Sequence, residues 1–251
     1  MIGERVQHVL LAPGFALLAG VVLTGAVAAQ APDFLFKRPT VTLGVKVGYA
    51  VPRANSEIFD FTREQLTVDK SDFNAWSLAG ELGVRATDRI DVALGVGGEW
   101  SSTRSEFREF VGTDDLPIEQ DTRLTRVPVT LGVKAYLLGR GRRISELAWI
   151  PSKWAPYVGG GGGFAWYRFQ QVGEFVDFDT LDIFFDDFES MGVAPLAYLT
   201  AGMDFSLGPR WFLNGETRYS WASAGMDRDF VDFDDIDLAG FRGTVGMSVR
   251  F

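Results

Sequence analysis

Apolar and polar residues alternate without a break at the C-terminal end of the chain, from Ala239 to Phe251. The odd positions of this stretch are apolar or glycine, and the even positions between them are polar or small. Because successive side chains of a strand point to opposite faces, the pattern predicts a β-strand with one apolar face. The strand ends on an aromatic residue, Phe251.

The same alternation recurs along the chain in segments of roughly ten residues, the length with which a tilted strand crosses a bilayer. We expect eight strands, at 40–49, 73–86, 90–101, 124–137, 156–170, 191–207, 211–221 and 238–251. Long connections at 51–72, 102–121, 171–190 and 222–237 alternate with tight ones at 87–89 and 208–210. This rhythm is typical of an outer-membrane barrel, with both termini on the periplasmic side.

Periodicity alone does not say which face points into the barrel, because a soluble lipocalin-type barrel would alternate as well. The charges decide between the two. In the third segment, one face carries Ile90, Val92, Leu94, Val96 and Trp100, and the other carries Asp91, Gly95, Gly97 and Glu99. Seven of the eight apolar faces hold no charged residue. Since a basic residue facing lipid at mid-bilayer costs ~2–4 kcal/mol, we predict an all-β protein, an eight-stranded antiparallel transmembrane β-barrel with its apolar face outside.

Aromatic residues at the strand ends fall at two levels, as interfacial belts do. The level expected to be extracellular holds Tyr49, Trp76, Trp100, Tyr219, Trp221 and Phe241, and the opposite level holds Trp211, Phe205 and Phe251.

Three places leave the pattern open. In 157–169 either the set Tyr157, Ala165, Tyr167 and Phe169 or the set Val158, Phe164 and Trp166 suits the lipid face. Pro128 and Pro195 lie inside expected strands, where each would mark a bulge or a strand end. The connection 139–155 is long for a periplasmic turn and holds Arg140, Arg142, Arg143, Trp149 and Trp154, so we interpret it as an interfacial helix.

The N-terminus has the pattern of a secretory signal peptide. Arg5 precedes an apolar run at 9–27, and small residues follow at Ala26, Ala28 and Ala29. We expect a signal peptide at 1–29, cleaved near Ala28 or Ala29, and a barrel domain at 30–251. An uncleaved membrane anchor is the alternative reading, because the run approaches the ~20 residues of a spanning helix.

Four segments resemble the small outer-membrane barrels of the OmpA transmembrane-domain, OmpX and OmpW type. They are RVPVTLGVKAYL (126–137), the glycine-rich 157–164, FLNGETRYSW (212–221) and GTVGMSVRF (243–251). The resemblance implies a bacterial outer-membrane location, contact with outer-membrane lipid and lipopolysaccharide, and a C-terminal recognition signal for the barrel assembly machinery. That signal would map onto Val245, Met247, Val249 and Phe251.

Charges of both signs lie on the face expected to point into the lumen. They are Lys46, Arg85, Arg126, Lys134, Arg218, Arg242 and Arg250, together with Glu81, Asp91, Glu99, Asp204 and Glu216. An unpaired buried charge costs several kcal/mol, so we predict an ion-pair network that fills the lumen. A gated or narrow ion path through the same residues is the alternative, and conductance separates the two.

The net charge of -9 argues against nucleic-acid binding and resides in the long loops, which we expect to be acidic and extracellular. The pentapeptide FVDFD occurs at 175–179 and again at 230–234. Its carboxylates Asp177, Asp179, Asp232 and Asp234 are candidate ligands for Ca²⁺ or Mg²⁺ bridging the loops, although no EF-hand spacing is present. Solvated loop ends are the plainer interpretation. The interleaved phenylalanines indicate either binding or strand extensions above the membrane.

No catalytic group stands out. Outer-membrane hydrolases generally resemble one another in using a histidine base, and the only histidine, His8, lies in the expected signal peptide. We therefore expect a structural or surface-binding protein without catalysis, cofactor or protein-bound metal centre. The alternative is a porin-like small pore, or a carrier of small, apolar molecules.

Overall fold

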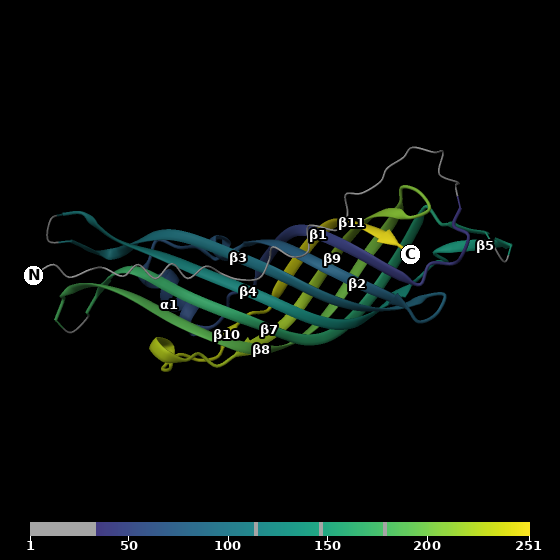
Figure 1. Cartoon of the computed structure of the whole chain (residues 1–251). Helices are drawn as coiled ribbons and strands as arrows, with labels where there is room; N and C mark the ends of the chain where they lie inside the picture. The colour runs from purple at the N-terminus through teal and green to yellow at the C-terminus, as the bar shows by residue number, and fades with distance from the viewer. Residues whose placement is uncertain (1–33, 113–114, 146–147, 178–179) are drawn as a thin grey trace, which may run out of the picture. The chain divides into compact units, whose positions relative to one another are not determined.

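The computed structural model describes residues 34–112, 115–145, 148–177 and 180–251, which belong to the unit Asp33–Phe251 (Figure 1). The expected signal peptide at 1–29 lies outside the described residues. No helix among those ranges combines the length and the apolar character that spanning a bilayer requires.

Eight antiparallel strands form a closed ring in the order β1-β2-β3-β4-β7-β8-β9-β11. Their bounds are β1 (Val41–Pro52), β2 (Ala75–Arg85), β3 (Ile90–Val111), β4 (Pro117–Tyr136), β7 (Trp154–Val176), β8 (Ile183–Ser206), β9 (Trp211–Ala224) and β11 (Gly240–Arg250). The ring closes where β1 pairs with β11, from Thr42 opposite Arg250 to Pro52 opposite Gly240. The predicted eight-stranded antiparallel barrel is confirmed.

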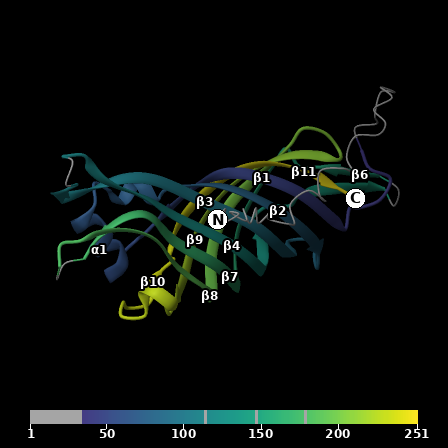
Figure 2. The same ribbon diagram turned by 60° about the vertical axis from the view of Figure 1, so that its left-hand side comes forward.

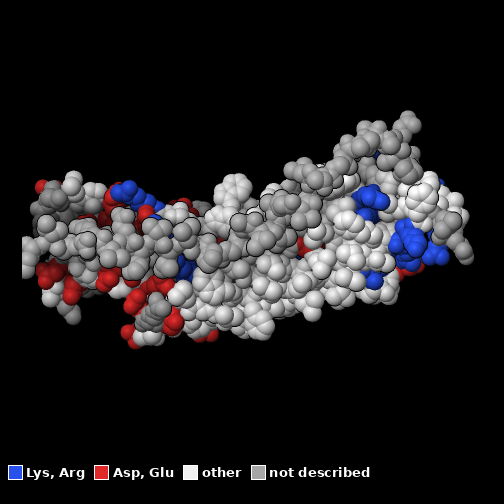
Figure 3. All heavy atoms as spheres, viewed as in Figure 1, with Lys and Arg blue, Asp and Glu red and all other residues white. Residues whose placement is uncertain are grey.

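The apolar face points outward along the ring. On β4, Leu131 is 58% exposed whereas Lys134 is 6% exposed, and β11 repeats the contrast with Val245 at 65% and Arg242 at 9%. On the face that Figure 3 shows, the middle of the barrel is mostly white, and the blue and red side chains gather toward the two ends. An apolar wall of this kind is what hydrocarbon solvent requires.

The face of β7 is settled by burial. Tyr157, Tyr167 and Phe169 point inward and are at most 1% exposed, whereas Phe164 points outward and is 63% exposed. Two glycines leave space for the tyrosine side chains that point into the lumen. A Cβ on Gly132 would collide with the Tyr198 hydroxyl, and one on Gly202 with the Tyr157 ring. The glycines therefore let tyrosines fill a narrow lumen.

The two prolines lie where the ladder is already incomplete. Between β3 and β4 the pairing stops at Val96 opposite Val129 and resumes at Glu99 opposite Arg126 in the same register, so Pro128 sits in an interruption without a bulge. Pro195 lies one residue before the β8–β9 pairing begins at Leu196. Each proline therefore lies where its strand is paired continuously with only one of its two neighbours.

Four strands are about twice as long as a membrane crossing needs. β3, β4, β7 and β8 have 22, 20, 23 and 24 residues, whereas β1, β2, β9 and β11 have 11 to 14. The connections expected at 102–121 and 171–190 are therefore mostly strand, which corrects the loop assignment. We call residues 101–111, 117–125, 167–176 and 183–195 the extension. Figures 1 and 2 show its hairpins continuing past the other strands.

Two other connections fold against the extension and form what we call the cap, residues 53–74 and 225–239. The cap contains α1 (Glu57–Gln65), η1 (Lys70–Phe73), η2 (Arg228–Phe230) and β10 (Ile236–Asp237). Helix α1 buries Ile58, Phe59 and Thr62, which share one face, and it carries acidic residues in its first turn and Arg63 in its last.

The connection after β4 forms a hairpin, β5 (Gly141–Ser145) paired with β6 (Ala148–Pro151), and the interpretation as an interfacial helix is wrong. Isoleucines on both sides favour strand. Trp149 is 4% exposed, and its backbone exchanges two hydrogen bonds of 2.9 Å with Leu35. The hairpin therefore turns back over the end of the barrel opposite the extension.

Candidate functional site

Two lysines and two glutamates meet in the middle of the lumen. Lys46 Nζ lies 2.7 Å from Glu81 Oε2 and 2.9 Å from Glu216 Oε2. Lys134 bridges the same two carboxylates, and Arg218 adds a third cation to Glu216 at 3.1 Å. Each carboxylate thus faces at least two cations, so neither carboxylate is buried without a counter-ion.

A second layer lies toward the extension. Glu99 accepts from Arg126 at 2.8 Å and from Arg242 at 3.1 Å. Arg126 also donates to the carbonyl of Leu238 at 2.9 Å, and Leu238 is part of the cap. The lumen network is therefore bonded directly to the segment that covers it.

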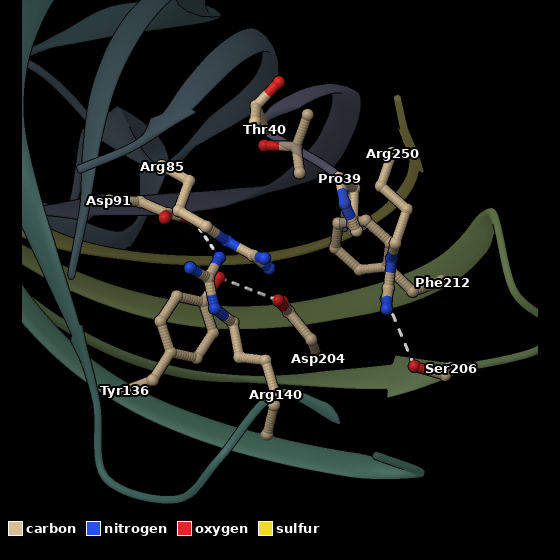
Figure 4. Close-up of a pocket in the computed structure, with 12 residues that line it drawn as sticks. Pro39, Thr40, Arg85, Asp91, Tyr136, Arg140, Asp204, Ser206, Phe212 and Arg250 are labelled. Carbon is tan, nitrogen blue, oxygen red and sulfur yellow. Dashed lines mark hydrogen bonds and ion pairs between the residues drawn. The ribbon is translucent and has the colours of Figure 1, made fainter. Parts of the chain in front are cut away.

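A third layer lies at the opposite end, where Figure 4 shows Asp91 and Asp204 among Arg85, Arg140 and Arg250. Arg140 pairs with Asp91, and the Tyr136 hydroxyl donates to Asp204 at 2.9 Å. Arg140 also stacks 4.3 Å from the centroid of the Tyr136 ring. Among the described residues Asp204 has no ion-pair partner, and it accepts hydrogen bonds from the uncharged side chains of Tyr136 and Asn214.

A chain of hydrogen bonds joins the last layer to the central one. The Asn214 amide donates to Asp204 at 2.8 Å and to the Tyr157 hydroxyl at 2.9 Å. Tyr157 in turn donates to Glu216 at 2.9 Å. A neutral tyrosine and an asparagine therefore connect carboxylates that ion pairs alone would leave separate.

Small voids remain between the layers. Voids of about 20, 20 and 30 Å³ are lined respectively by Asp204 and Arg250, by Lys46 and Glu81, and by Glu99 with Arg242. A water molecule needs roughly 10–15 Å³ of such space. Each void therefore has room for one or two water molecules.

The structure joins most of the predicted lumen charges in ion pairs, and it adds Arg140 to them. Among the described residues, Arg85, Arg250 and Asp204 make no ion pair, and the Nε and Nη1 of Arg85 are buried without a hydrogen-bond partner. Arg140 was expected at the membrane interface but reaches Asp91 in the lumen. Tyr157 and Asn214 also belong to the lumen network, but a search for charged residues does not find them. Their only signal in the sequence is a polar side chain at an inward position of an alternating strand.

The cap has a core of a different kind. Phe59 is fully buried and meets Phe73 and Phe169 edge-on, with ring centroids 4.8 and 6.0 Å apart. The row continues from Phe169 to Phe230 at 5.4 Å and onward to Phe188. Aromatic rings from both segments of the cap thus pack against the walls of the extension, as in the core of a water-soluble domain.

The edge of β8 that leaves the ring is covered by carboxylates. The backbone N–H of Met191 donates to Asp227 at 3.0 Å, and the N–H of Glu189 donates to Asp229 at 2.9 Å. Both aspartates come from the segment around η2. They occupy the positions that a neighbouring strand's carbonyls would take.

The acidic residues proposed as cation ligands lie in different surroundings. Asp177 directly follows β7 and accepts from the Thr180 N–H at 3.1 Å, while Asp179 lies outside the described residues. Asp234 accepts from the Glu57 N–H at 3.0 Å, and Asp232 is exposed nearby. Within the described ranges, no group of three or more His, Cys, Asp or Glu side chains is arranged to hold a metal ion.

One acidic residue of the cap is bound firmly. Asp237 accepts from the guanidinium of Arg53 at 2.6 Å, and this hydrogen bond raises the pKa of Arg53 above its usual value. The N–H of Asp237 donates to the Ser56 hydroxyl at 3.1 Å, next to the start of α1. Asp237 therefore ties the two segments of the cap together.

A groove of about 700 Å³ lies between the hairpin ends of the extension. It is lined by charged residues, Arg104, Glu119, Asp121 and Glu174, and by apolar ones such as Leu116 and Phe185. Leu116 is 61% and Phe185 73% exposed. Figure 3 shows acidic side chains gathered over this end of the molecule.

The model for the outer membrane protein beta-barrel domain matches residues 16–251. No curated protein sequence matches the chain. Among solved structures, Neisserial surface protein A is 11% identical, with 84% of this chain and 96% of that chain covered and a TM-score of 0.47. OprG from Pseudomonas aeruginosa is 14% identical, with 86% and 99% covered and a TM-score of 0.43. Ail from Yersinia pestis is also 14% identical, with 85% and 100% covered and a TM-score of 0.41.

The family match spans nearly the whole chain and agrees with the ring of eight strands and its apolar outer wall. This chain belongs to the outer membrane protein β-barrel family and is a small β-barrel protein of the bacterial outer membrane.

Proposed function

We propose that this barrel has a structural or surface-binding role without catalysis, in which the ring is a closed anchor and the extension is the binding part. The observation that carries the proposal is the contrast in length between the strands. Four strands end near the aromatic level, whereas β3, β4, β7 and β8 continue well beyond it. A barrel that only spanned the membrane would not need the additional residues.

Two features support a closed lumen. The central carboxylates Glu81 and Glu216 are each held by two lysines, and the voids beside them have room for only one or two waters. Above them, the cap fills the space between the strands with a packed aromatic core. Passage of a solute would require both the ion pairs and this core to open.

The groove at the hairpin ends supports a binding role. Large exposed apolar side chains beside charged ones mark interaction sites, and Val111 at 66% exposure lies at the same end as Leu116 and Phe185. We test this on cells displaying the protein, by measuring their retention on octyl-coated beads. Leu116→Ser combined with Phe185→Ser should lower retention several-fold. Val231→Ser, which changes a 64% exposed residue of the cap, is the matched control.

A narrow ion path, or a carrier of small molecules, is the second candidate, because the voids recur from one layer of the lumen to the next. Planar-bilayer conductance of the refolded barrel discriminates the two. The closed-anchor proposal expects no stable current from the wild type. A current in the wild type that grows in Lys134→Ala, which removes one of the two bridging lysines, would establish the ion path instead.

Assembly and surface partners belong to the same proposal. Val245, Met247 and Phe251 are exposed on the outer face of β11 and Val249 is partly exposed there, where the assembly machinery could read them. We expect Phe251→Ser to lower the amount of folded barrel in the outer membrane.

For divalent cations, a calcium titration followed by Trp fluorescence should show saturable binding. This binding should be lost in Asp232→Asn with Asp234→Asn. An unresponsive wild type would remove calcium from the proposal.

A further inference from the structure

A pocket of about 430 Å³ lies at the end of the barrel opposite the extension, beneath the β5–β6 hairpin. Five arginines line it, Arg38, Arg85, Arg89, Arg140 and Arg143, together with Trp149 and a single acidic residue, Asp88. Figure 3 shows basic side chains gathered over this end of the molecule, which contrasts with the acidic extension.

The positive charge of the pocket is not balanced. Arg38 pairs with Asp88, and Arg140 pairs with Asp91. Arg85, Arg89 and Arg143 make no ion pair with any described residue. Burial and the nearby Arg140 and Arg143 lower the pKa of Arg38, as expected where cations crowd together. Within the described ranges, these three guanidinium groups therefore have no carboxylate within ion-pair distance.

One of these groups is also held in place without its hydrogen bonds. The guanidinium of Arg85 lies 5.6 Å from the centroid of the Trp149 ring, and its Nε and Nη1 are buried with no partner. Buried donors are almost always bonded in folded proteins. A fixed guanidinium with free donors is suited to an oxyanion, above all to phosphate, which matches its planar fork.

Exposed apolar residues flank the pocket residues along the chain. Leu137 and Leu138 directly precede the pocket residue Gly139, and they are 56% and 57% exposed. Ile144 follows Arg143 and is 60% exposed, and Trp154 at the start of β7 is 51% exposed. This combination of an aromatic residue, aliphatic side chains and arginines is typical of a surface at the level of lipid headgroups.

We propose that this pocket binds a phosphate-bearing anion, the headgroup of an anionic phospholipid of the periplasmic leaflet, through Arg85, Arg89 and Arg143. The acyl chains lie against Leu137, Leu138 and Ile144. A phospholipid held in this way covers the mouth that Trp149 and the hairpin already narrow.

The test uses the refolded full barrel in lipid nanodiscs that contain phosphatidylcholine with a small fraction of phosphatidylglycerol. Native mass spectrometry after release into detergent counts the phosphatidylglycerol molecules retained per barrel. Arg89→Gln with Arg143→Gln should lower retention at least roughly tenfold, because two charge-assisted contacts are lost. Arg142→Gln is the matched control, since Arg142 lies next to Arg143 in β5 but does not line the pocket.

Heat-modifiable gel mobility confirms that each variant is folded. Equal retention by Arg142→Gln and by the double variant overturns the proposal. A second arm adds inorganic phosphate to the wild type at millimolar concentration. Release of the lipid by phosphate at this concentration assigns the site to free phosphate, which overturns the lipid headgroup as its ligand, whereas retention supports the headgroup.

Discussion

The ring and the extension use the same strands with different polarity. On β4, the residues that point inward within the ring include Lys134, Thr130 and Arg126. Within the extension they are the apolar Leu124 and Ile118 and the uncharged Thr122 and Gln120. The outward residues change in the other direction, from the exposed Leu131 to the exposed Arg123 and the half-buried Asp121, whose charges lie 3.1 Å apart. The reversal takes place between Arg126 and Leu124, without any change in register.

The difference shows that the sidedness of a strand follows the solvent on each side. Where lipid lies outside, the apolar side chains face outward and the charges pair inside. Where water lies outside, the cap supplies an apolar filling and the charges face outward. The two regions should therefore respond differently to the same kind of substitution.

The largest effect is expected in the lumen. Glu216→Gln leaves Lys46, Lys134 and Arg218 with one partner fewer, and removing one member of a buried ion pair costs roughly 3–5 kcal/mol. Urea unfolding in lipid vesicles measures the free energy of unfolding, with the exposed Glu109→Gln as control. A loss no greater than that of the control would mean that the lumen does not need its carboxylate.

A similar effect confined to the cap is expected from Phe59→Ala. Truncating this fully buried ring removes its contacts with Phe73 and Phe169 and costs about 3 kcal/mol of local stability. Hydrogen exchange should show faster opening of the cap while the ring strands stay protected. Phe61→Ala on the same helix should cost clearly less, because Phe61 is 38% exposed and meets Phe233 edge-on at 5.5 Å. Faster exchange throughout the ring would show that the two regions unfold together.

An arginine substitution on the outer face should have a different effect in the ring, which faces lipid, than in the extension, which faces water. Leu131→Arg puts a charge in lipid and should lower the free energy of unfolding by ~2–4 kcal/mol. Val111→Arg places the same side chain on the extension, where water solvates it, and should stay within about 0.5 kcal/mol. Equal effects in the vesicle unfolding assay would contradict a lipid boundary between these residues.

The smallest effect is expected for an ion pair outside the ring. Arg168 pairs with Glu189 and its side chain is 42% exposed, so Arg168→Gln should cost no more than about 1 kcal/mol. The loss should shrink further at high salt, because screening weakens exposed pairs. A loss of unfolding free energy as large as that of Glu216→Gln, and unchanged by salt, would show that this exposed ion pair behaves like the buried pairs of the lumen.

The ring could be predicted because one rule, apolar outside and polar inside, holds along most of its strands; in β7 the run of glycines left the facing open until burial settled it. The extension could not, since beyond Arg126 the same alternation carries the opposite meaning, and Arg123 reads as a break in the pattern. The cap depends on contacts such as Phe59 with Phe169 and Phe230 with Phe188, which join residues far apart in the chain. Arg140 was misplaced for the same reason, because only the fold-back of the hairpin brings it to Asp91.

The aspartates along the free edge of β8 have a consequence for crowding. An outer membrane holds many barrels side by side, and an unpaired edge strand of one copy could form backbone hydrogen bonds with the edge strand of another. A carboxylate accepts the amide hydrogens of Glu189 and Met191 but offers no donor with which the row could continue. Each molecule therefore terminates its own sheet, and the hairpins can stand close to their neighbours without fusing into a fibre.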